Sequence, residues 1–130
     1  MDGDEAMIVA GIGCRAGCSG TDIVAAVRAC LAMAAREADA LAVPCFRADL
    51  PAVAEAADVL ALPLVSVTRR ALLDAQARCR TRSEAALRAT GIASVAEGAA
   101  LAAAGPDAVL LQRRIVRGGA TCALAGDAMP

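Results

Sequence analysis

The chain has 130 residues, of which 36 are alanine and only one is aromatic, so we expect a single domain with a core of small side chains. Its formal net charge is −1, and it contains no histidine, which excludes a Ser-His-Asp triad and a Cys-His pair. Charges interrupt every apolar run before the ~18 residues needed to span a bilayer, and the acidic start at residues 2–5 is unlike a signal peptide. We therefore expect a cytoplasmic protein with no membrane segment.

The first half of the chain alternates apolar runs with helical patterns. Buried strands are predicted at residues 7–12, 41–45 and 62–67. The helices that follow these strands are predicted to begin at Ser19–Thr21, at a cap on Asp49 and at a cap on Thr68. The third of these helices is expected to end near Cys79. Strand and helix in alternation predict a parallel α/β sheet with right-handed crossovers.

From Arg80 the pattern changes to two short helices and a hairpin. The first helix is predicted to begin at Ser83 and end at Gly91, and the second to begin at Ser94 and end near Gly105. Two strands, at 109–116 and 120–125, are joined by a tight glycine turn. The predicted fold class is therefore α/β, a single compact domain over 1–130 with its core at 7–126. We expect a mixed, mostly parallel five-stranded sheet flanked by helices and ending in a C-terminal β-hairpin.

The most informative segment is 11–23, where a strand leads through a glycine-rich turn into a helix. Backbone N–H groups of such a turn can converge on an anion near a helix N-terminus. The alternative is a tight connection in which Ser19 and Asp22 form a capping box. The segment matches neither a Walker loop nor the dinucleotide fingerprint. The residues predicted to contact a ligand here are Gly11, Gly13, Cys14, Arg15, Gly17, Ser19, Gly20 and Thr21.

Glu97 is a second candidate, because it is a lone acid among small residues. Such a carboxyl group can act as a general acid or base. The alternative is again a capping box, in which the Glu97 carboxylate accepts a hydrogen bond from the Ser94 N–H.

The hairpin at 113–122 is the third candidate. Its charged residues can be a solvated edge that discourages aggregation. In the functional alternative, Gly118, Gly119 and Thr121 let the backbone approach a ligand.

The cysteines and the charge distribution restrict the class of ligand. Cys14 and Cys18 are the only close pair among six cysteines and no second pair follows, so we expect structural thiols and no metal site. The net charge is −5 over residues 1–68 and +5 over 69–117, and a basic half can attract a polyanion. Nucleic acid is not expected, because Phe46 is the only aromatic residue and no helix is basic on one side.

Taken in order, these segments resemble the CobE / CbiG C-terminal family of cobalamin biosynthesis. The matching residues, spread over 7–126, are Gly11-Ile-Gly-Cys-Arg15, Gly17, Ser19, Cys45-Phe-Arg-Ala-Asp49, Leu62-Pro-Leu64, Ser83, Gly91, Ser94-Val-Ala-Glu97, Ala99-Ala-Leu101 and Gly118-Gly-Ala-Thr121. The resemblance implies a compact α/β domain of the stand-alone CobE type. It also adds Arg47 and Ser94 to the residues expected to bind a ligand.

The resemblance implies a role in corrin-ring synthesis. Precorrins and hydrogenobyrinic-type corrinoids carry many carboxylates, which turn amides and arginines such as Arg15 can bind. We therefore expect a carrier or accessory protein that binds such an intermediate and has no cofactor. Two alternatives remain. One is a small enzyme that acts on a precorrin side chain or ring lactone, with Glu97 as acid or base. The other is a non-catalytic partner that docks onto a methyltransferase or another enzyme of the pathway.

Overall fold

One five-stranded sheet organises the fold in this computed structural model, which describes residues 7–127. The strands are β1 (Val9–Cys14), β2 (Ala40–Pro44), β3 (Leu64–Val67), β4 (Val109–Arg117) and β5 (Ala120–Gly126). Their order across the sheet is β3-β2-β1-β5-β4. The β1–β2 and β2–β3 pairs are parallel, whereas β1–β5 and β4–β5 are antiparallel. The sheet is therefore mixed rather than mostly parallel, because the hairpin adds its antiparallel strands directly beside β1.

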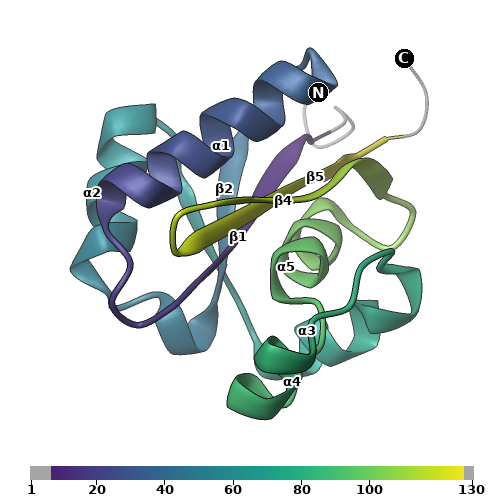
Figure 1. The fold of residues 1–130 in the computed structure, drawn as a ribbon. Helices are drawn as coiled ribbons and strands as arrows, with labels where there is room; N and C mark the ends of the chain where they lie inside the picture. Colours follow the sequence, from purple (N-terminus) through teal and green to yellow (C-terminus); the bar gives the residue numbers. More distant parts are fainter. Residues whose placement is uncertain (1–6, 128–130) are drawn as a thin grey trace.

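The helices cover both faces of the sheet, as Figure 1 shows. They are α1 (Gly20–Ala34), α2 (Pro51–Leu60), α3 (Arg69–Ala75), α4 (Glu84–Thr90) and α5 (Val95–Ala104), with short 3-10 turns at Cys45–Arg47 and Gln76–Arg78. Helices α1 and α2 lie on one face, and α3 and α5 lie on the other. No helix within residues 7–127 has the length and apolar character needed to cross a membrane.

The core has two layers because side chains of a strand alternate between the faces of the sheet. Ala10 and Ile12 of β1 pack toward α1 and α2, together with Ile23 and Val53. On the other face the contact is much closer. A Cβ atom added to Gly11 would overlap the main-chain atoms of α5 at Ala96 and Ala100. The abundant small residues therefore allow a helix backbone to lie directly on β1.

Several local predictions are confirmed. Thr68 caps α3, since its Oγ1 accepts a hydrogen bond from the Ala71 N–H at 3.1 Å. Ser83 caps α4 in the same way, and this helix ends at Gly91, whose φ of 81° is left-handed. The hairpin forms as predicted, with Gly118 at its tip in a left-handed conformation, φ 59°.

Other local predictions are wrong in detail. Leu50, not Asp49, occupies the cap position of α2, and no side chain caps that helix. Pro51 begins it, since proline fixes the first helical φ and has no N–H to satisfy. Helix α3 ends at Ala75, and the segment predicted to extend it to Cys79 forms a 3-10 turn. The acidic start at residues 2–5 lies outside the described residues.

Candidate functional site

Most of the residues predicted to contact a ligand lie at one end of the sheet, where the parallel strands β1 and β2 finish. The glycine-rich turn follows β1 there, and the Cys45–Arg47 turn follows β2. The tip of the β4–β5 hairpin reaches the same place, because Ala120 pairs with Cys14. In Figure 1 the hairpin tip and the β1–α1 turn both lie on the left of the view. Ligands of open α/β sheets usually bind outside this carboxyl end.

The glycine-rich turn is fixed by its own backbone and by the hairpin. The Arg15 N–H donates to the Gly119 carbonyl oxygen at 3.2 Å, and the Cys18 N–H donates to the Arg15 carbonyl oxygen at 3.0 Å. The hydroxyl of Thr121 donates to the Gly13 carbonyl oxygen at 3.2 Å. Ser19 caps α1, because its hydroxyl oxygen accepts from the Asp22 N–H at 3.1 Å.

These contacts leave several amides of the turn without an acceptor among residues 7–127. They are the N–H groups of Ala16, Gly17, Ser19, Gly20 and Thr21. Gly17 is exposed, and no heavy atom lies within 4 Å of the position that a Cβ would take there. The outer part of the turn is therefore open to a ligand group, whereas the N–H groups of Arg15 and Cys18 are already used.

Arg47 ties the end of β2 to the end of β1. Its Nε donates to the Cys14 carbonyl oxygen at 3.0 Å, and its Nη1 donates to the Phe46 carbonyl oxygen at 3.4 Å. The guanidinium also lies 5.5 Å from the centre of the Phe46 ring. Arg15, in contrast, is exposed, and neither arginine forms an ion pair with another described residue. Both positive charges therefore remain uncompensated at this end of the sheet.

The N-terminus of α5 meets the same end of the sheet from the opposite face. Gly13 lies against Val95, the first residue of α5, whereas Gly11 lies against Ala96 and Ala100. Helix α5 therefore runs antiparallel to β1 and begins where β1 finishes. No side chain caps it, and among the described residues the N–H groups of Val95, Ala96 and Glu97 have no acceptor. The positive ends of two helix dipoles, those of α1 and α5, thus flank the end of β1.

Glu97 lies in the first turn of α5 with no exposed surface. Its Oε1 accepts hydrogen bonds from the Arg80 N–H at 2.6 Å and the Thr81 N–H at 2.9 Å. Its Oε2 accepts from the Arg114 N–H at 2.9 Å, and the Ser94 hydroxyl lies 3.4 Å from Oε1. The carboxylate therefore joins the segment before α4 to strand β4. This geometry gives Glu97 a structural role, and a catalytic role stays a prediction.

The capping box expected for Ser94 and Glu97 is wrong. The Ser94 N–H donates to Gln76 Oε1 at 3.1 Å instead, and Gln76 Nε2 donates to the Ser94 carbonyl oxygen at 3.0 Å. Gln76 therefore takes the place that the Glu97 carboxylate was predicted to fill. Ser94 is 2% exposed, so its side chain is not available to a ligand.

The surroundings of Glu97 lower the pKa of its carboxyl group. Burial raises the pKa of Glu97, but the N–H donors of Arg114, Thr81 and Arg80 together outweigh burial, so the pKa lies below its usual value of 4.5. A carboxyl group whose pKa is lower in the folded state stabilises the fold above its unfolded pKa. That contribution is lost as the pH falls through the folded pKa.

We therefore predict that the difference in unfolding free energy between wild type and Glu97→Gln is constant above about pH 5.5 and shrinks below about pH 4.5. Urea unfolding of both proteins at several pH values measures this difference. A difference that stays the same down to about pH 3 would contradict the ionised buried carboxylate.

The remaining predicted site residues divide into surface and packing positions. Gly118 and Gly119 lie at the hairpin tip, beside the turn. Gly11 and Gly20 are buried, and a Cβ on Gly20 would lie 2.8 Å from Oε1 of Glu55 in α2. Both are needed for close packing of helices. Gly11 lies inside β1, within the predicted strand, and packs against α5.

The cysteines show no metal-binding arrangement. Within residues 7–127 no group of three His, Cys, Asp or Glu side chains could hold a metal ion. Burial raises the pKa of the Cys14 thiol to about 12, and the neighbouring Cys18 adds to the shift. Cys14 therefore stays protonated near neutral pH, which makes it a poor nucleophile.

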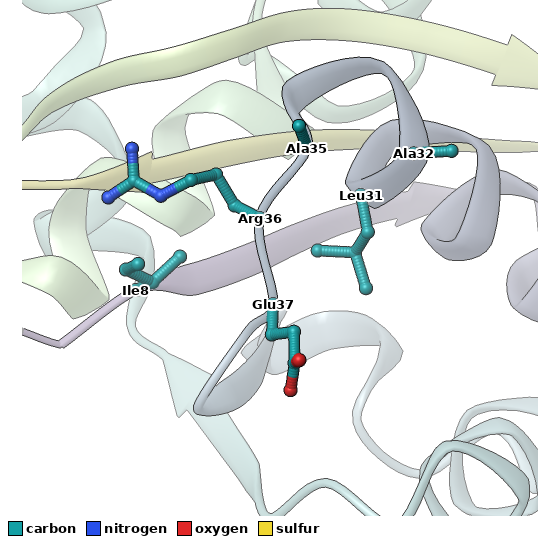
Figure 2. A pocket seen from close by; sticks show the side chains of 6 residues that line it. All are labelled: Ile8, Leu31, Ala32, Ala35, Arg36 and Glu37. Carbon is teal, nitrogen blue, oxygen red and sulfur yellow. The ribbon is translucent and has the colours of Figure 1, made fainter.

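A surface pocket lies at the opposite end of the sheet. Figure 2 shows it beside Ile8, just before β1, and the last turn of α1. The other residues that line it are Leu31, Ala32, Ala35, Arg36 and Glu37. None of them belongs to the predicted site.

Two residues that organise the site, Asp22 and Gln76, were not predicted in these roles from the sequence. Asp22 was considered only as part of a capping box, but its carboxylate Oδ2 accepts from the Gly119 N–H at 3.2 Å, 97 residues away. Gln76 was not considered at all. The partners of both residues are distant in sequence, and no local pattern reveals them.

Comparison with known proteins places nearly all of the described residues in one family. A family model described as Cobalamin synthesis G C-terminus matches residues 8–125. CobE, a protein from the cobalamin (vitamin B12) biosynthetic pathway, has a solved structure that is 38% identical with a TM-score of 0.85, covering 93% of this chain and 90% of that one. The cobalamin biosynthesis protein chiG from Agrobacterium tumefaciens str. C58 is 43% identical with a TM-score of 0.75, covering 93% and 98%. The search of curated proteins gives no match.

Proposed function

The chain belongs to the cobalamin synthesis G C-terminus family and is a protein of cobalamin biosynthesis, and from this premise we propose that it binds a corrinoid intermediate. The ligand is of the precorrin or hydrogenobyrinic type, a flat ring surrounded by acetate and propionate side arms. Recognition takes place through these carboxylates at the carboxyl end of β1.

One observation carries the proposal: the N-termini of α1 and α5 flank the end of β1 from opposite faces. Helix N-termini favour anions because their first N–H groups and the helix dipole both present positive charge. The described residues offer no acceptor for the N–H groups of Gly20 and Thr21 in α1, nor for that of Val95 in α5. Arg15 adds a free charge, so two carboxylates of one ligand can be bound together.

The role is that of a carrier or accessory protein rather than of an enzyme. Glu97 is the one fully buried acid among residues 7–127, and both of its oxygens already accept hydrogen bonds. Cys14 is held as a neutral thiol. A carrier needs only to hold a labile corrinoid and pass it on, which fits a surface of amides and arginines.

Titration of the pure protein with hydrogenobyrinic acid, followed through the corrin absorption bands, tests the proposal. Arg15→Ala is expected to weaken binding roughly tenfold, because a charge-assisted hydrogen bond to a carboxylate is lost. The side chain of Arg15 is exposed, so the variant should unfold like the wild type.

Arg28→Ala is the matched control, since Arg28 is also exposed but lies in the middle of α1, away from its N-terminus. It should bind as the wild type does. If the bands do not change with the wild-type protein, and no corrinoid elutes with it on gel filtration, the proposed function is wrong. Equal weakening in the two variants would instead indicate a general charge effect.

A further inference from the structure

The tip of the β4–β5 hairpin is fastened to the glycine-rich turn through a single residue. Both peptide groups of Gly119 are engaged: its carbonyl oxygen accepts from the Arg15 N–H at 3.2 Å, and its N–H donates to Asp22 Oδ2 at 3.2 Å. The first bond reaches the turn itself, and the second reaches the first turn of α1. The tip therefore lies across the N-terminal end of α1.

The tip carries no side chain with which to hold this position. A Cβ on Gly118 would overlap the Asp22 carboxylate, and one on Gly119 would lie 3.1 Å from Cβ of Cys18. Glycine allows this close approach without strain, and Gly118 also needs it for its left-handed φ of 59°. Beyond the last ladder pair, Cys14 with Ala120, the position of the two tip glycines therefore depends on the two bonds of Gly119. Thr121, two residues beyond Gly119 in β5, adds its bond to Gly13.

Asp22 has the same chemistry as the ligand groups proposed for this site. Its carboxylate is a negative charge in the first turn of α1, the position where a helix dipole favours an anion. A ligand carboxylate that approaches the N–H groups of Gly20 and Thr21 enters the same field. The Asp22 carboxylate and the ligand carboxylate repel each other, and both can accept hydrogen bonds from the N–H groups at this end of the sheet.

We propose that Asp22 is a positioning residue that latches the hairpin tip over the turn, and that a carboxylate of the bound corrinoid releases this latch. The inference rests on the proposed function for the nature of the ligand. Like-charge repulsion drives the Asp22 carboxylate from the Gly119 N–H, and the glycine tip then swings away from the turn. Asp22 thereby raises the ligand concentration that is needed for binding.

Amide hydrogen exchange of Gly119 and Arg15, measured by NMR, reports on the latch directly. Without ligand, both amides should exchange about tenfold faster in Asp22→Ala than in the wild type. The Gly119 N–H loses its acceptor, and the released tip carries the Gly119 carbonyl oxygen away from the Arg15 N–H. Asp22→Asn keeps an acceptor oxygen without the charge, so it should retain the slow exchange. Its affinity for hydrogenobyrinic acid should be about threefold higher than that of the wild type, because one repulsive charge is removed.

Saturating hydrogenobyrinic acid should speed the exchange of both amides in the wild type and change little in Asp22→Ala. If both amides stay protected while the absorption bands show binding, the latch is wrong and the proposed function stands. If no corrinoid binds to any of the three proteins, the proposed function and ligand release both fail. The exchange of Asp22→Ala without ligand then still decides whether Asp22 holds the tip, and an unchanged rate would overturn that too.

Discussion

Replacing Glu97 by glutamine is expected to lower the free energy of unfolding by about 3 kcal/mol, although the two side chains have almost the same shape. The reason lies in the donors that surround the carboxylate. Oε1 accepts two backbone N–H groups and Oε2 accepts a third. Glutamine offers one oxygen and one NH2 group, so in either orientation the NH2 group meets an N–H donor. At least one buried N–H then has no acceptor.

Urea unfolding near neutral pH measures this effect. Glu84→Gln is the control, because Glu84 lies at the surface and pairs with Arg82 at 3.2 Å in an exposed ion pair. Such pairs contribute little, and the control should stay within about 0.5 kcal/mol of the wild type. A Glu97→Gln protein as stable as this control would contradict the structural role. If the Glu97→Gln protein is also stable, binds the corrinoid normally and has lost turnover, the enzyme hypothesis with Glu97 as acid or base is favoured instead.

The sequence predicts those features whose causes are local. Thr68 and Ser83 cap helices because their hydroxyl oxygens reach an N–H three residues ahead, and the pattern contains both partners. Gly91 and Gly118 adopt left-handed backbone that few other residues accept. The succession of strands along the chain and the hairpin follow from the apolar runs and from the glycines between them, whereas the order of the strands across the sheet does not.

The features that the sequence does not reveal depend on partners far along the chain. The pattern Ser94-x-x-Glu97 is identical to that of a capping box, yet Glu97 binds the backbone of Arg80 and Arg114, 17 residues away on either side. Asp22 similarly reaches the hairpin rather than its own helix start. In both cases the carboxylate accepts a hydrogen bond from an N–H group far away in the sequence. Only the folded structure shows which N–H group that is.

The sequence predicts which segments form the site, but it does not predict all of the contacts between them. The glycine-rich turn and the hairpin tip were both selected, and the structure brings them together through Arg15 and Gly119. Ser94 and Glu97, at the N-terminus of α5, were also assigned to the site, but the sequence did not predict that this N-terminus lies beside the end of β1. Its position follows from the packing of α5 against Gly11 and Gly13, which depends on three-dimensional contact and not on spacing.

Gly11→Ala is expected to destabilise the fold by about 3 kcal/mol or to prevent folding. The added methyl group would overlap the Ala96 carbonyl oxygen and the Ala100 nitrogen. Both are main-chain atoms of α5, so no side chain can rotate to make room, and α5 must lift away from β1. The packing that places the N-terminus of α5 beside the end of β1 would then be lost. Thermal and urea unfolding measure the loss.

Gly17→Ala is the matched control for the same substitution within the same segment. Nothing lies within 4 Å of the position of its Cβ, so its stability should stay within about 0.5 kcal/mol of the wild type. The pair separates two roles for these glycines, which sequence reasoning grouped together as ligand contacts. If Gly11→Ala folds with wild-type stability but binds hydrogenobyrinic acid weakly, then Gly11 contacts the ligand and the packing role is wrong. If Gly11→Ala destabilises the fold as expected, and Gly17→Ala keeps wild-type stability but weakens binding, the ligand lies against the outer part of the turn.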